Sequence, residues 1–142
     1  MKNKKIKLIG SSILISALAS GVILGTTANA APVIKITPAK GLKNGQKVTV
    51  TGKGFTPKDN VFVLECTNSA KGEADCDITG AVPAKIDAKG NLPKVVFTVS
   101  TGNIGTMTCG TSKKDAAACD ISVGNITGGD STTGAIVFTV SK

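Results

Sequence analysis

The sequence contains no histidine, arginine, tryptophan or tyrosine, and its only aromatic residues are four phenylalanines. The lack of histidine excludes Ser-His-Asp and Cys-His catalysis, and it excludes metal sites built on imidazole. The lack of arginine and of aromatic platforms argues against direct nucleic-acid binding. Guanine and phosphate favour bidentate arginine contacts, and single-stranded bases stack on aromatic rings. These absences predict a protein that is not an enzyme, with no catalytic residue.

The first thirty residues have the pattern of a secretory signal peptide. Four lysines lie within the first seven residues, an apolar stretch follows over residues 8–24, and Ala28-Asn29-Ala30 is an A-x-A cleavage pattern. An uncleaved anchor is the alternative, but glycines and serines dilute the apolar stretch and no basic stop-transfer run follows it. We therefore predict a signal peptide over residues 1–30 and a mature domain over residues 31–142. The mature protein is expected to be secreted, with no membrane attachment.

The net charge of +8 changes when this leader is removed. Cleavage takes away four of the 17 lysines and no acid, which leaves 13 lysines against nine carboxylates and a net charge of +4. The remaining lysines are scattered, and only Lys113 and Lys114 are adjacent. Such scattering is typical of a solvated surface rather than of a nucleic-acid site.

All four cysteines, Cys66, Cys76, Cys109 and Cys119, lie in the predicted exported part. An even number of cysteines in an oxidising compartment predicts two disulfides, for which three connectivities exist. Pairing within each local interval is the simplest, and it would stabilise the fold by about 2–3 kcal/mol per bridge in the chain-entropy model. Zinc is the alternative, but zinc sites usually show C-x2-C spacing, so we predict no metal site.

Short alternating or apolar segments separated by glycine, asparagine and proline predict strands along the mature chain. They cover residues 33–37, 46–51, 61–66, 81–86, 95–99, 106–109, 119–123 and 135–140. Pro83 indicates an edge strand, residues 41–45 a turn, and the glycine-rich residues 128–134 a flexible loop. About seven short strands without an amphipathic helix favour an all-β fold, a seven-stranded immunoglobulin-like β-sandwich.

Two polar groups are candidate sites. Glu65, Glu73, Asp75 and Asp77 cluster around the first cysteine pair, which indicates either a calcium-binding loop or a solvated loop tip; the order of a calcium loop is absent, so we favour the solvated loop. A glycosidase carboxylate pair would lack aromatic platforms for the sugar. Asn125 begins a glycosylation sequon, for which a loop is a sufficient explanation.

The mature chain resembles the neocarzinostatin family, secreted apoproteins that carry enediyne chromophores. The motifs that carry this resemblance run in order through almost all of residues 31–142. They are residues 31–32, 36–42, Gly45, 48–50, 52–55, the strand that ends at Cys66, 87–90, 116–119, 123–124 and 135–138.

The resemblance implies a sandwich with local disulfides Cys66–Cys76 and Cys109–Cys119 and a ligand cleft beside the larger sheet. It implies a monomer that needs no cofactor and shields a small apolar chromophore non-covalently. The released chromophore cleaves DNA, so such proteins are called antibiotic, antimicrobial or DNA-binding. By position, the residues expected to bind the ligand are Leu64, Asn68, Ala81, Ile104, Met107, Asp120 and Ser122.

The aromatic residues of the family's cleft are missing here. Asn68 and Ala81 stand at two of these positions, and residues 100–106 contain no phenylalanine or tryptophan. Each lost stacking residue removes about 1 kcal/mol beyond area burial. Two hypotheses follow: a secreted carrier of a small apolar ligand, or a secreted immunoglobulin-like structural or interaction module that binds no chromophore.

Overall fold

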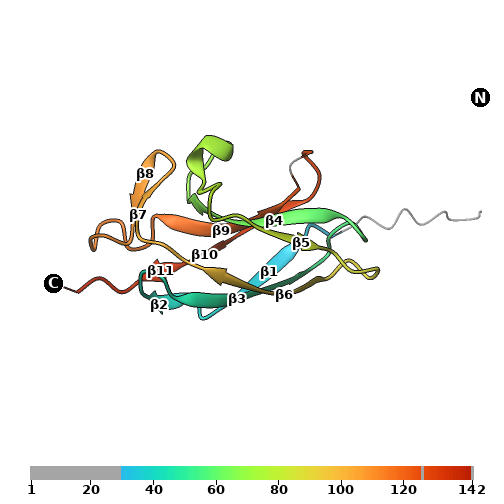
Figure 1. Cartoon of the computed structure of the whole chain (residues 1–142), viewed down its shortest axis with the longest axis horizontal. Coiled ribbons are helices and arrows are strands. Elements are labelled where there is room, and N and C mark those ends of the chain that lie inside the picture. The colour runs from blue at the N-terminus through green and yellow to red at the C-terminus, as the bar shows by residue number, and fades with distance from the viewer. Residues whose placement is uncertain (1–29, 126, 142) are drawn as a thin grey trace, which may run out of the picture.

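The computed structural model describes residues 30–125 and 127–141, which form a sandwich of two main antiparallel sheets (Figure 1). One sheet has the order β1-β3-β6, with β1 Val33–Thr37, β3 Lys47–Lys53 and β6 Leu92–Thr98. The other has the order β10-β9-β4-β5, with β10 Ser131–Ala135, β9 Cys119–Gly124, β4 Asn60–Thr67 and β5 Val82–Lys85. The all-β, immunoglobulin-like sandwich is confirmed, and its two main sheets hold seven strands.

The core lies between these sheets and follows the two-residue period of the strands. In β3, Val48 and Val50 are buried whereas Lys47 is exposed, as predicted. In β9, Cys119, Ile121 and Val123 point inward. Pro83 lies in β5 at the edge of its sheet, which confirms the edge position.

Four short strands lie beside the main sheets within the described residues. β2 Lys40–Leu42 pairs with β11 Val137–Phe138, and β7 Gly102–Ile104 forms a hairpin with β8 Met107–Cys109. The strand predicted over residues 135–140 is therefore divided: Ala135 ends β10, and only residues 137–138 form β11. The turn predicted at 41–45 also begins inside β2.

The flexible loop predicted over residues 128–134 is wrong, because β10 begins at Ser131 and pairs with β9 along its length. Thr132 and Thr133 favour a strand, but the flanking glycines, Asp130 and Ser131 favour turns, and the segment has no apolar alternation. The edge of β9 offers hydrogen-bonding groups that need partners, so tertiary context decides the conformation.

The two disulfides join Cys66 to Cys76 and Cys109 to Cys119, which confirms the local pairing that the resemblance implied. The first ties the end of β4 to a 3-10 helix over Glu73–Asp75, and the second ties β8 to β9. Each bridge spans ten residues of sequence.

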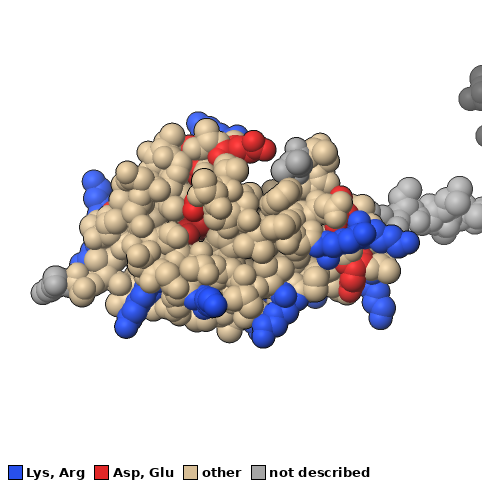
Figure 2. Space-filling model, viewed as in Figure 1, with Lys and Arg blue, Asp and Glu red and all other residues tan. Residues whose placement is uncertain are grey.

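Lysine side chains are distributed over the three-stranded sheet. Lys35, Lys47, Lys53 and Lys94 are exposed, and β1, β3 and β6 contain no aspartate or glutamate. Figure 2 shows lysines spaced along the lower edge of the molecule, where Figure 1 places this sheet.

The predicted signal peptide, residues 1–30, lies almost entirely outside the described residues and stays a prediction. No helix in the described part of the chain is long and apolar enough to cross a membrane.

Candidate functional site

A cleft of about 460 Å³ lies over the outer face of the four-stranded sheet. Leu64 and Cys66 of β4, Asp120 and Ser122 of β9 and Thr133 of β10 lie along the strands beneath it. Asn68 and residues 70–73 border it on one side, in the loop of residues 68–75 that we call the first wall. Asn125 and Ser131 border it on the other side, in the β9–β10 connection that we call the second wall. Figure 1 shows the two loops, after β4 and between β9 and β10, standing above the sheet. The cleft is therefore a sheet surface with two loop walls.

The lining combines apolar and polar side chains. No aromatic side chain is found among the described residues that line the cleft, whereas Asn68, Asp120 and Ser122 are polar. Burial raises the pKa of the Asp120 carboxyl above its ordinary value. Lys71 and Glu73 add one charge of each sign at the exposed first wall.

The β7–β8 hairpin holds the first wall in place. The Thr106 hydroxyl donates to Asp75 Oδ1 at 2.6 Å, and the Ser69 hydroxyl donates to the Met107 sulfur at 3.3 Å. The Lys71 amide also donates to Asp75 Oδ2 at 3.0 Å. These hydrogen bonds, that from Lys71 first and that from Thr106 second, lower the pKa of Asp75. Asp75 thus joins the wall to the hairpin.

The second wall is tied to the loop before β4. Asn125 Nδ2 donates to Asp59 Oδ2 at 2.5 Å, and the Thr56 amide donates to an oxygen of the Asp130 carboxylate. The Asn125 side chain of the predicted sequon is therefore already occupied in a hydrogen bond.

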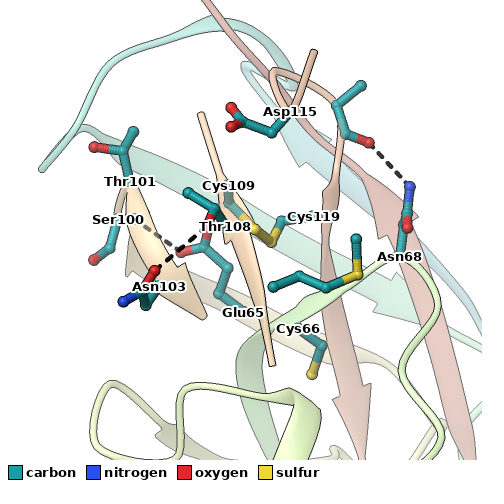
Figure 3. Close-up of a disulfide and its surroundings, with 12 residues drawn as sticks. Glu65, Cys66, Asn68, Ser100, Thr101, Asn103, Thr108, Cys109, Asp115 and Cys119 are labelled. Carbon is teal, nitrogen blue, oxygen red and sulfur yellow. Dashed lines mark hydrogen bonds between the residues drawn. A yellow bond between two sulfur atoms is a disulfide. The ribbon is translucent and has the colours of Figure 1, made fainter. Parts of the chain in front are cut away.

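Glu65 is buried behind the cleft, and its assignment to a solvated acidic loop is wrong. It is 1% exposed and lies on the same inward face of β4 as Val61 and Val63. The alternation of β4 alone would have placed it there. Figure 3 shows its side chain extending toward Ser100, whose amide donates to Glu65 Oε2 at 2.8 Å.

The other carboxylate oxygen, Glu65 Oε1, is buried with no hydrogen-bond partner among the described residues. Burial raises the pKa of Glu65 to about 7, the Ser100 hydrogen bond opposes this shift, and the nearby Asp77 charge adds to it. Glu65 is thus a buried carboxyl with one donor and one unpaired oxygen.

Of the remaining acids of the predicted cluster, Glu73 lines the cleft, whereas Asp75 and Asp77 have local structural roles. Asp77 Oδ1 accepts hydrogen bonds from the Thr79 amide and hydroxyl, at 3.0 and 2.6 Å, and from the Gly80 amide at 3.2 Å. No group of three or more potential metal-ligating side chains is found in the described part of the chain.

The structure separates the residues predicted to bind ligand into two sets. Leu64, Asn68, Asp120 and Ser122 line the cleft together with the Cys66–Cys76 bridge. Ala81, Ile104 and Met107 do not line it: Ile104 is buried in the core, and Met107, 40% exposed, lies on the hairpin against Ser69. The hairpin packs on the outer side of the first wall rather than over the sheet.

Several lining residues were not predicted, namely Lys71, Glu73, Asn125, Ser131 and Thr133. The last two escaped because β10 was expected to be a loop. Once β10 is recognised as a strand, its two-residue period places both side chains on the cleft face.

The fold and the cleft define a small immunoglobulin-like sandwich with two local disulfides and a binding-site-sized hollow on its larger sheet. The sequence profile of the Neocarzinostatin family matches residues 34–140. The chain therefore belongs to the neocarzinostatin family.

Individual relatives agree with this assignment. The chain is 40% identical over 62 residues to macromomycin from Streptomyces macromomyceticus, a match that spans 44% of this chain and 43% of that protein. It is 26% identical over 121 residues to the antitumor antibiotic C-1027 apoprotein from Streptomyces globisporus, covering 80% of both chains. It is 28% identical over 107 residues to apokedarcidin from an actinomycete, covering 70% of this chain and 91% of that one.

Two solved structures show the same architecture. Macromomycin superposes with a TM-score of 0.60 at 30% identity, covering 77% of this chain and all of that one. Apokedarcidin superposes with a TM-score of 0.53 at 26% identity, covering 78% of this chain and all of that one.

Proposed function

We propose that the protein is a secreted, monomeric carrier that binds one small apolar molecule non-covalently in the cleft. The observation that carries this proposal is the 460 Å³ hollow on the larger sheet of a chain in the neocarzinostatin family. A relative named as the apoprotein of an antitumour antibiotic supports the same function. The ligand is expected to be an enediyne-type chromophore or a molecule of similar size.

The protein's contribution is burial rather than chemistry. Leu64 and the Cys66–Cys76 bridge offer apolar surface, and Asn68, Asp120 and Ser122 orient the ligand through hydrogen bonds. Ala81 and Met107 are proposed to touch only a ligand that extends past the first wall toward the hairpin. Ile104, which is buried in the core, is proposed to support the hairpin without touching the ligand. The protein needs no catalytic residue, metal or cofactor, and any damage to DNA comes from the ligand without direct contact between protein and nucleic acid.

The second candidate is a secreted structural or interaction module that carries no chromophore. The aromatic-free lining among the described residues favours it, because polycyclic ligands bind best where rings stack. Sandwiches serve many functions, so the fold does not choose between the two.

Organic extraction of native protein from culture medium, followed by mass spectrometry, tests the carrier function. We expect one small molecule in stoichiometric amount, and an N-terminus at Ala31 if the signal peptide is cleaved. A Ser122→Trp variant fills the cleft and should lose the molecule. The matched control Thr98→Trp places the same ring on the exposed face of β6 and should retain it. Folded native protein that yields no small molecule favours the module.

A further inference from the structure

Glu65 combines three features that an inert core residue does not have. Its side chain is 1% exposed, it carries an ionisable group, and one of its carboxylate oxygens has no partner among the described residues. A charge buried with a single neutral donor is costly, so such a group favours its neutral form. Glutamine would have the same shape without the charge, so the carboxyl adds sensitivity to protons and nothing that packing requires.

The surroundings of Glu65 provide little to stabilise a negative charge. Residues 98–109, which run from the end of β6 through the hairpin, contain no titratable side chain apart from the bridged Cys109. On the neighbouring β9, Ile121 pairs with Glu65 and Asp120 lines the opposite face. Asp77, in the loop after the first disulfide, is a negative charge that acts on Glu65. Lys43 and Lys47, near the start of β3, are exposed.

A continuous set of contacts links Glu65 to the first wall of the cleft. The Glu65 carboxylate holds the Ser100 amide, two residues before β7. The hairpin that follows is joined to the wall through Thr106–Asp75 and Met107–Ser69. Glu65 also accepts a hydrogen bond on its main-chain oxygen from the Asp77 amide at 2.8 Å. Its neighbours on β4, Leu64 and Cys66, line the cleft itself.

We propose that Glu65 is a proton-sensitive anchor of the cleft: when its carboxyl is neutral it holds the β6–β7 connection and the hairpin against the first wall, and loss of its proton loosens them. Ionisation strengthens the single hydrogen bond from Ser100, but the larger effect is the cost of a charge buried away from water. That cost favours a shift of the Ser100 segment that admits water to Glu65 Oε1, which has no donor among the described residues. The hairpin then docks less tightly on residues 68–75. A pKa near 7 places this change at neutral pH.

One part of this proposal rests on the carrier function: loosening of the wall would speed ligand release as the pH rises above neutral. The response of Glu65 and of the hairpin needs no ligand. The two parts can therefore fail separately.

The test uses the isotopically labelled mature protein and its Glu65→Gln variant between pH 5.5 and 8. NMR follows the Glu65 side-chain carboxyl and the hydrogen exchange of amides in residues 100–109, corrected for intrinsic exchange. We expect a Glu65 midpoint near 7 and about a tenfold or greater loss of protection at pH 8 for these amides. Amides of β1 and β3 serve as the internal reference. Glu65→Gln should show equal protection at both pH values.

Three results would overturn the proposal: a Glu65 midpoint near 4.5, hairpin protection in the wild type that does not change relative to β1 and β3, or the same loss in Glu65→Gln. The wild-type titration remains decisive if the variant does not fold. A pH-dependent hairpin in a protein that yields no bound molecule would instead keep the anchor and reject the carrier function.

Discussion

Gly105 lies directly against the backbone of Asp75, so that a Cβ atom at Gly105 would be 2.4 Å from Asp75 Cα. The turn of the β7–β8 hairpin and the 3-10 helix of the first wall therefore meet backbone to backbone. Gly105 also has φ +54, a region that side-chain-bearing residues rarely adopt. Any residue other than glycine must move the hairpin away from the wall.

Gly105→Ala is thus expected to destabilise the protein by about 2–3 kcal/mol, because backbone strain adds to the clash. Urea unfolding measures this difference. Gly45→Ala is the matched control: Gly45 has φ +75 but nothing within 4 Å of the added methyl. It should cost only about 1 kcal/mol. Equal losses in the two variants would contradict the close docking of the hairpin.

The pH dependence of global stability follows from the sign of the Glu65 shift. The folded pKa of about 7 lies above the unfolded value of 4.5, so the folded state binds more protons in this range. The contribution of Glu65 to the free energy of unfolding is fully present below pH 4.5. It declines as the pH rises from 4.5 to about 7 and is lost above that pH. The loss is about 3 kcal/mol. Denaturant unfolding at a series of pH values should show this decline in the wild type, and Glu65→Gln should flatten it.

Lowering the pH below about 4 decreases stability through three other carboxyls, those of Asp75, Asp87 and Asp115. Backbone hydrogen bonds from Lys71, Asn91 and Ser112 are the first causes of the lowered pKa values of Asp75, Asp87 and Asp115, respectively. The contribution of these aspartates to the free energy of unfolding is present above their unfolded pKa of 3.8. It is lost as the pH falls through their lowered folded pKa values. We therefore expect greatest stability in mildly acidic solution. A stability maximum above pH 7 would contradict the raised pKa of Glu65, and a maximum below pH 3.8 would contradict the lowered pKa values of the three aspartates.

The two disulfides should differ in what their removal costs. Both span ten residues, so the chain-entropy contribution is the same, about 2–3 kcal/mol. Cys109 and Cys119 belong to the hydrophobic core, whereas Cys76 is only half-buried. Replacing the pair Cys109 and Cys119 by alanine should therefore cost about 1 kcal/mol more than replacing Cys66 and Cys76. Unfolding of the two double variants under identical conditions measures the difference, and the reverse order would contradict it.

The contact between Asn125 and Asp59 can be tested by exchanging the two side chains. Asn125→Asp removes the donor and places two carboxylates together, which should cost about 1–3 kcal/mol. Adding Asp59→Asn restores one donor and one acceptor with their positions exchanged. The double variant should recover most of the lost stability in thermal unfolding. A double variant as unstable as Asn125→Asp would show that the pair contributes nothing to the second wall.

The sequence was most informative where local pattern and burial agree. Alternation predicted β1 and β3, a nearly continuous apolar run predicted β4, and a short strand segment was predicted at β9. Pro83 correctly placed β5 at an edge. Alternation failed for β10, because its residues show no apolar and polar alternation. This segment is a strand because it pairs with β9 along its length. The short pairs β2–β11 and β7–β8 depend on contacts that no local pattern encodes.

The cleft residues on regular strands could be predicted from the sequence, whereas those positioned by tertiary contacts could not. Leu64, Asp120 and Ser122 lie on predicted strands, and strand geometry fixes the side toward which they point. Ile104 and Met107 lie on the hairpin, whose direction depends on Gly105 and on the Thr106–Asp75 hydrogen bond. The burial of Glu65 was overlooked because its charge was given more weight than the period of β4.

The two walls of the cleft are anchored to different parts of the sandwich, one to the hairpin through Asp75 and the other to the loop before β4 through Asp59. Insertions or substitutions in one loop leave the anchor of the other intact. Changes in one wall can therefore alter the width and the chemistry of the cleft while the other wall keeps its position. A scaffold of this kind lends itself to re-engineering for new small molecules, with the sheet as the constant base.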